Sequence, residues 1–179
     1  MRINAICLAL VFVLLSPYAS GQWTQTNGPY GGYVQTFCVS GTKVFAGTFG
    51  GGVFLSADSG RSWKAVNAGL TNTLVGSLVV SGSNLFAGTD NGVFISTNDG
   101  TSWTAVVSGL TSTIVLSLAA SSTNLFAGTY FGGVFLSTNH GTSWTAARTG
   151  LTNLHVQALA VSGALLFAGT KGGVFLSSI

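Results

Sequence analysis

The sequence has 179 residues, of which 47% are hydrophobic and only 5% are charged, and its formal net charge is +3 at pH 7. A charge this small excludes the broad basic surface with which proteins grip phosphate backbones, so we expect no nucleic-acid partner. The acidic residues are Asp58, Asp90 and Asp99, and the chain contains no glutamate.

The segment from Met1 to Gly21 is predicted to be a secretory signal peptide. Arg2 supplies a positive charge, an apolar run extends from Ala5 to Leu15, and small residues follow up to Gly21. The run is too short and ends too abruptly to span a bilayer as a helix. We therefore expect cleavage after Gly21 or Ser20. The mature domain would be residues 22–179, with no membrane span and a secreted or periplasmic location.

The rest of the chain repeats with a period of about 40 residues, which lies in the range of propeller and solenoid repeats. The period is marked by Trp23, Trp63, Trp103 and Trp144, and by the runs VFAGT at 44–48 and LFAGT at 85–89, 125–129 and 166–170. Each unit contains four short apolar runs separated by Gly, Ser, Asn and Thr, and none has the periodicity of a helix over three turns. Runs of this kind predict β-strands joined by tight turns.

Four strands in about 40 residues are typical of one blade of a β-propeller. A β-solenoid is the alternative, but its turns are usually shorter and rarely need four reversals in each unit. The sequence opens on a tryptophan strand and closes on a run that should precede one, so its two ends add up to one unit. We predict an all-β protein, a β-propeller of four-stranded antiparallel blades. Its four blades would be closed by pairing of the Trp23 strand with Val174–Ser177 in the last blade.

Three copies of an eight-residue segment follow the GVF(L/I)S runs, and we refer to them as the box segments. They read SADSGRSW at 56–63, STNDGTSW at 96–103 and STNHGTSW at 137–144. They resemble the Asp-box, or BNR repeat, S-x-D-x-G-x-x-W, of sialidases, sortilin-type receptors, xyloglucanases and photosystem assembly factors. The resemblance implies a propeller in which each box segment joins the third and fourth strands, on the face away from the binding site.

The box positions are interpreted as structural. Asn98 and Asn139 replace the acid of Asp58, and an amide carbonyl accepts the same turn hydrogen bonds without a charge. The glycines supply the positive φ of the turn, and the tryptophans are large apolar anchors. The predicted structural residues are Ser56, Asp58, Gly60, Trp63, Ser96, Asn98, Gly100, Trp103, Ser137, Asn139, Gly141 and Trp144.

The sequence offers little for metal binding or catalysis. A calcium site gathers six to eight oxygen ligands, whereas each box segment has one carboxylate at most. We therefore expect no metal and no cofactor. Glycoside hydrolysis needs two carboxylates, and outside the box segments only Asp90 remains. We predict that the protein is not an enzyme. The alternative is a sialidase-like or glycosidase-like enzyme, or a detached module of a larger propeller protein.

Isolated reactive side chains are also interpreted as structural. Cys38 aligns with Val79 of the next unit, which favours an inert, buried thiol on an inner strand over a nucleophile. His140 lies in a box segment, whereas His155 aligns with Leu74 of an earlier unit, so the two histidines are not an obvious metal pair.

Departures from the repeat gather in the turn between the second and third strands of each unit, which reads TFGGGV, TDNGV, TYFGGV and TKGGV. We expect these turns and the linkers between blades to share one face, opposite the box segments. Aromatic, acidic and basic side chains around a pore mouth suit recognition of a sugar or a peptide. Neutral variation in exposed turns is the alternative. The candidate ligand-binding residues are Phe49, Asp90, Tyr130, Phe131, Lys171 and Tyr30, and the expected partner is a protein or a glycan.

Overall fold

The structure is a computed structural model that describes residues 23–122 and 124–179, so the predicted signal peptide lies outside the described residues. The described residues form fifteen strands and no helix. This agrees with the sequence, because short apolar runs between glycine-rich turns allow strands but are too short for stable helices. The predicted all-β class is confirmed.

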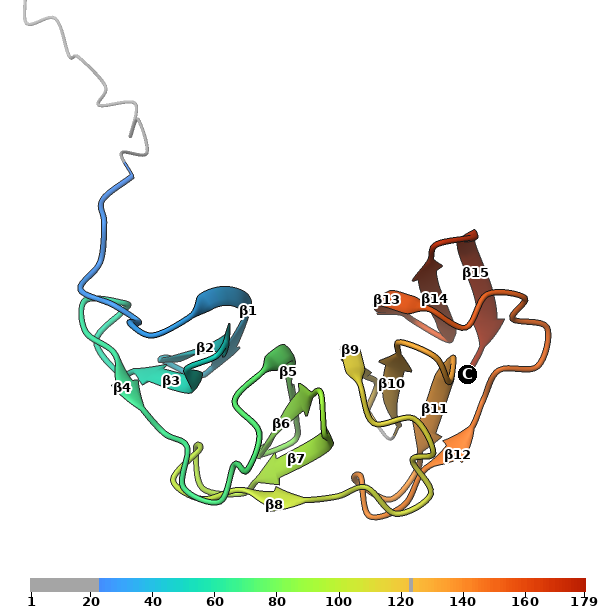
Figure 1. Cartoon of the computed structure of the whole chain (residues 1–179), viewed down its shortest axis with the longest axis horizontal. Helices are drawn as coiled ribbons and strands as arrows, with labels where there is room; N and C mark the ends of the chain where they lie inside the picture. Colours follow the sequence, from blue (N-terminus) through green and yellow to red (C-terminus); the bar gives the residue numbers. More distant parts are fainter. Residues whose placement is uncertain (1–22, 123) are drawn as a thin grey trace, which may run out of the picture.

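Each repeat unit folds into one antiparallel sheet in which consecutive strands are neighbours (Figure 1). The first sheet contains β1 (Tyr33–Ser40), β2 (Lys43–Phe49), β3 (Gly52–Ser56) and β4 (Lys64–Ala65). The second contains β5 (Val75–Ser81), β6 (Asn84–Thr89), β7 (Gly92–Ser96) and β8 (Thr104–Ala105). The third contains β9 (Val115–Ala120), β10 (Leu125–Thr129), β11 (Val134–Ser137) and β12 (Thr145–Ala146). The fourth contains β13 (Val156–Ser162), β14 (Leu165–Thr170) and β15 (Gly173–Ser178).

The four sheets are arranged as the blades of a propeller, with β1, β5, β9 and β13 on the concave side of an arc (Figure 1). First strands of successive blades pack against one another. The close approach explains the glycine in the first three (V/L)-F-A-G-T runs, at Gly47, Gly88 and Gly128. A Cβ at Gly88 would lie 2.6 Å from Val115 Cγ1 of the next blade, and one at Gly128 would lie 2.6 Å from Val156 Cγ1. The four-bladed architecture predicted from the repeat is confirmed.

The hydrophobic core lies between successive blades and repeats with the sequence. The cluster between the first two blades contains Phe45, Val53, Leu70, Val75, Leu78, Leu85, Ala87, Phe94 and Trp103. The cluster between the second and third blades contains the aligned residues Phe86, Val93, Leu110, Val115, Leu118, Leu125, Ala127, Phe135 and Trp144. Trp103 and Trp144 are only 4% and 3% exposed, so an indole fills each of these interfaces.

The ring is not closed in the described structure. The predicted pairing of the Trp23 strand with the last blade is therefore wrong. The fourth sheet has the order β13-β14-β15, without the Trp23 strand beside Val174–Ser177. Asn27 instead pairs with Ser62 of the first blade. The first and fourth blades lie at the two ends of an open arc, which keeps residues 23–28 away from β15 (Figure 1).

Candidate functional site

The turns between the second and third strands lie beside the linkers that join successive blades. In the first blade, the amides of Gly50 and Gly52 both donate to the Thr73 carbonyl at 3.1 Å. The Gly92 amide of the second blade donates to the Thr113 carbonyl at 2.7 Å. These turns and linker ends therefore form one surface, which we call the turn face. The expectation that these turns lie beside the linkers is confirmed in these two blades, whereas a position opposite the box segments stays a prediction.

A group of aromatic and cationic side chains lies on the turn face of the third and fourth blades. The rings of Tyr130 and Phe131, which follow β10, are 4.3 Å apart between centroids and meet edge to face at 78°. The imidazole of His155, which precedes β13, lies 4.3 Å from the Tyr130 ring. Lys171, which follows β14, places its Nζ 5.9 Å from the centre of the same ring. We call Tyr130, Phe131, His155 and Lys171 the Tyr130 group.

A pocket of about 360 Å³ adjoins this group. Its lining includes the Phe131 ring, Arg148 and residues 111–114 of the linker between the second and third blades. The guanidinium Nη1 of Arg148 donates to the Gly132 carbonyl at 3.2 Å, which ties the arginine to the turn after β10. The residues that line the pocket thus include an exposed aromatic residue, a cationic one and three that carry a hydroxyl, Thr111, Ser112 and Thr113.

The structure brings together only half of the candidate ligand-binding residues. Tyr130, Phe131 and Lys171 belong to the Tyr130 group, whereas the other three lie elsewhere on the chain. Phe49 forms a bridge with Leu74 in the first blade and is 46% exposed. The Tyr30 hydroxyl donates to Asn27 Oδ1 at 2.6 Å. Asp90, in the turn between β6 and β7, is half-buried.

Sequence reasoning missed the threonines that line the pocket. Thr111 and Thr113 lie in GLTSTIV, which differs little from the linkers GLTNTLV and GLTNLHV of the other units. Near-identical letters carry no sign of a special role. In the structure, this linker and Phe131 line one pocket.

The box segments show how aspartate and asparagine occupy one position. In the first segment, Asp58 Oδ1 accepts hydrogen bonds of 2.9 Å from the Ser56 hydroxyl and from the Ser62 amide. In the second, Asn98 Oδ1 accepts the same two bonds at 2.9 Å from Ser96 and Ser102. Ser62 and Ser102 occupy the same position of the two segments, but the hydroxyl of Ser62 donates a hydrogen bond and that of Ser102 accepts one, since a hydroxyl can do either.

The difference lies in the second polar atom of the side chain, which is Oδ2 in Asp58 and Nδ2 in Asn98. The Ser62 hydroxyl donates to Asp58 Oδ2 at 2.6 Å, whereas the Ser102 hydroxyl accepts from Asn98 Nδ2 at 2.9 Å. The hydroxyl and amide of Ser62, followed by the hydroxyl of Ser56, lower the pKa of Asp58 to about 2. The carboxylate is therefore ionised at neutral pH and satisfied within its own turn.

The backbone of the box segments is left-handed at two successive positions. The φ angles are 88° at Gly60, 80° at Gly100 and 80° at Gly141. The residue before each glycine also has positive φ, 60° at Ser59 and 56° at Asp99. Glycine avoids the Cβ clash that makes this region costly, while Asp tolerates it as a single residue.

Reactive side chains are dispersed in the part of the chain that the structure describes. No three His, Cys, Asp or Glu residues lie close enough there to hold a metal ion. Burial raises the pKa of the Cys38 thiol, which lowers its thiolate content. No helix among residues 23–122 and 124–179 is long and apolar enough to cross a membrane.

The fold and the turn-face pocket define a β-propeller with a candidate ligand-binding surface. The chain belongs to the family of the DUF6242 beta propeller domain, whose model matches residues 53–172. No curated protein matches it significantly.

Solved structures share the fold at low sequence identity. The computationally designed Ika4 protein is 16% identical with a TM-score of 0.68, and the match covers 87% of this chain and 96% of Ika4. An ancestral GH74 enzyme is 24% identical with a TM-score of 0.68, over 87% of this chain and 24% of the enzyme. The extracellular domain of BT4673 from B. thetaiotaomicron is 20% identical with a TM-score of 0.70, over 86% of this chain and 22% of that domain. The chain thus spans about a quarter of the length of the GH74 enzyme and of the BT4673 domain.

Proposed function

We propose that this chain is a secreted or periplasmic, non-catalytic propeller of the Asp-box type that binds a glycan or a protein at the turn face. The observation that carries the proposal is the Tyr130 group beside the pocket of about 360 Å³. Phe131 is 68% exposed although its ring is held against Tyr130. An exposed aromatic side chain with a fixed orientation is suited to anchor a ligand.

The chemistry of the pocket favours a glycan as the first ligand to test. A sugar ring presents an apolar face, which can stack on an aromatic ring, and hydroxyls, which need donors and acceptors around the rim. Phe131 offers the ring, while Arg148 and the hydroxyls of residues 111–113 offer the polar partners. A peptide with an acidic side chain would meet the same cation and ring, so a protein partner is the second arm of the test.

Several features support the remaining parts of the proposal. The three box segments share one hydrogen-bond pattern around the S-x-(D/N)-x-G-x-x-W sequence, which supports the Asp-box assignment. The absence of glutamate leaves Asp90 as the one acid outside these segments, which supports a non-catalytic role. Secretion is supported by the apolar sequence between Met1 and Gly21.

The test is a glycan array followed by titration calorimetry with the best ligand. We expect Phe131→Ala and Tyr130→Ala to weaken binding about 30-fold, or about 2 kcal/mol, if each truncation removes an anchor. His140→Ala, in the box segment of the same blade, is the matched control and should leave affinity unchanged. Loss of binding in the control alone would place the site on the other face. Hydrolysis of the bound glycan would instead support the glycosidase alternative.

A further inference from the structure

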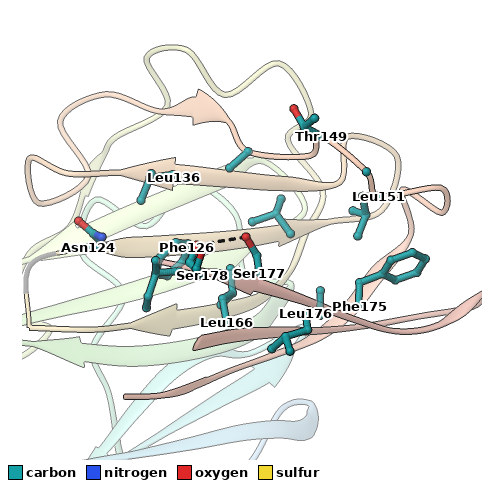
Figure 2. A pocket seen from close by; sticks show the side chains of 15 residues that line it. Asn124, Phe126, Leu136, Thr149, Leu151, Leu166, Phe175, Leu176, Ser177 and Ser178 are labelled. Atoms are coloured by element: carbon teal, nitrogen blue, oxygen red, sulfur yellow. Dashed lines mark hydrogen bonds between the residues drawn. The ribbon is translucent and has the colours of Figure 1, made fainter. Parts of the chain in front are cut away.

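A second cavity, of about 270 Å³, lies between the third and fourth blades (Figure 2). Its walls are mostly apolar and include Leu136 and Phe126 of the third blade and Leu166 and Phe175 of the fourth. Ser177 and Ser178, at the end of β15, also line it. The cavity is thus an opening in the third of the interfaces between blades, whereas Trp103 and Trp144 are buried in the first two.

The cavity occupies the position that an indole fills in the two preceding interfaces. The third core cluster includes Phe126, Val134, Leu151, Val156, Leu159, Leu166, Ala168 and Phe175, which align with the first eight residues of the first cluster. Trp103 and Trp144 have no aligned residue in the third cluster. The third interface, within the described residues, therefore lacks one side chain of its repeat.

Hydrogen-bond partners confirm this equivalence. The indole Nε1 of Trp103 donates to the Val66 carbonyl at 2.7 Å, and that of Trp144 donates to the Val106 carbonyl at 2.8 Å. The next residue in this series is Ala147, which lines the cavity. Gly150 also lines the cavity, and a Cβ added to it would have no neighbour within 4 Å. A Cβ added to the aligned Gly109 would clash with the Trp144 carbonyl.

The same chain carries an indole that is not buried. Trp23 precedes Trp63 by one repeat period and is 100% exposed. Its segment, residues 23–28, begins with the W-T that also begins the fourth-strand segments at Trp103 and Trp144. The cavity and Trp23 therefore match in chemistry and in register, but the segment that Trp23 begins pairs with the first blade, whereas the cavity lies between the third and fourth.

The two ends of the arc also carry the halves of one more interface between blades. Val115 and Val156 are 1% and 0% exposed because they pack on the glycine strand of the preceding blade, whereas the aligned Val34 is 39% exposed. At the other end, the built Cβ of Gly169 meets only Ala158 of its own sheet, at 3.4 Å. Val174 is 75% exposed. An interface between these two surfaces would repeat the packing seen inside the chain.

We infer that two copies of this chain associate head to tail. Residues 23–28 of one copy add the missing fourth strand to β15 of the other, Trp23 enters the cavity, and Val34 packs on Gly169. Two such contacts close a ring of eight blades. A second copy is the occupant because the chain's own residues 23–28 lie with the first blade, at the far end of the arc (Figure 1).

The internal blades fix the expected register of the added strand. Leu55 pairs with Lys64, Ile95 with Thr104 and Leu136 with Thr145. The aligned pair in the inferred contact is Leu176 with Thr24 of the other copy. One interblade hydrogen bond is absent from this contact, because Ala158 stands where Thr36 and Ser77 accept from the next blade.

The first experiment measures molar mass by size-exclusion chromatography with light scattering. We expect the mature chain to run at twice the mass of one copy, and Trp23→Ala to raise the dissociation constant of the dimer about 30-fold. Trp23 is fully exposed in a single copy, so this truncation removes no contact from the fold. Phe131→Ala, another exposed aromatic, is the control and should leave the dimer intact. A single-copy mass for the unaltered chain would overturn the inference, and a larger assembly would exclude the eight-bladed ring.

The second experiment separates two copies from closure within one chain. Thr24→Cys and Leu176→Cys are combined in a chain with Cys38→Ser, and with Cys7→Ser if the segment up to Gly21 is retained. We expect oxidation to give disulfide-linked chains on a non-reducing gel, since paired residues of neighbouring strands lie within disulfide distance. Gln25→Cys with Leu176→Cys is the control, because a shift of one residue turns the side chain to the opposite face. A disulfide within single chains, or none, would overturn the inference.

Discussion

The tryptophans that fill the interfaces between blades should dominate stability, and Trp103→Ala tests this directly. Trp103 is 4% exposed, packs in the first core cluster and donates its Nε1 proton to the Val66 carbonyl at 2.7 Å. Truncating a buried aromatic side chain to alanine costs roughly 3–5 kcal/mol, and loss of one hydrogen bond adds about 1 kcal/mol. Because the two contributions overlap, we expect a cost of about 4 kcal/mol for the variant.

This loss is large compared with the total stability of a domain, which is typically about 5–15 kcal/mol. Trp144→Ala should cost about the same, because Trp144 is 3% exposed and makes the equivalent bond, of 2.8 Å, to Val106. Phe131→Ala removes a ring that is 68% exposed and should change stability by less than about 0.5 kcal/mol.

The assay is urea unfolding followed by circular dichroism, at one protein concentration for all variants. Repeat arrays can lose cooperativity when one interface is weakened. The slope of each transition should therefore be compared along with its midpoint. A cost below about 1 kcal/mol for Trp103→Ala, or equal costs for Trp103→Ala and Phe131→Ala, would refute the idea that the indoles hold the blades together.

Two further predictions concern single positions of the repeat. Asp58→Asn should leave the urea midpoint nearly unchanged at pH 7, because Asn98 and Asn139 accept the same turn hydrogen bonds. The folded pKa of Asp58, about 2, lies below its ordinary value of 3.8, so the ionised side chain stabilises the fold above pH 3.8. This contribution is lost as the pH falls to about 2, and acid titrations should show that the variant lacks this part of the transition. Gly88→Ala should cost about 1–3 kcal/mol in thermal or urea unfolding, because its Cβ would lie 2.6 Å from Val115 Cγ1. Gly169→Ala, measured in the Trp23→Ala background to keep the copies apart, should cost far less, and equal costs would contradict the packing argument.

The sequence by itself determined the blade, because its information is local. The regular repeat period, four apolar runs per unit and a glycine at every reversal limit each unit to one small antiparallel sheet. The asparagines at the acid position of two box segments already indicated that charge is not needed there, and the Asn98 hydrogen bonds agree with this.

Only the tertiary structure decided which of the turn residues that depart from the repeat come into contact, and whether the four blades close into a ring. Tyr130, His155 and Lys171 belong to distant parts of the chain, and only the packing of the fourth blade on the third brings them into contact. The sequences of the two ends add up to one repeat unit and so suggested a closed ring, but this match does not fix the angle between blades. That angle depends on how β5, β9 and β13 pack on their neighbours, and in this structure it leaves Trp23 and its matching cavity apart.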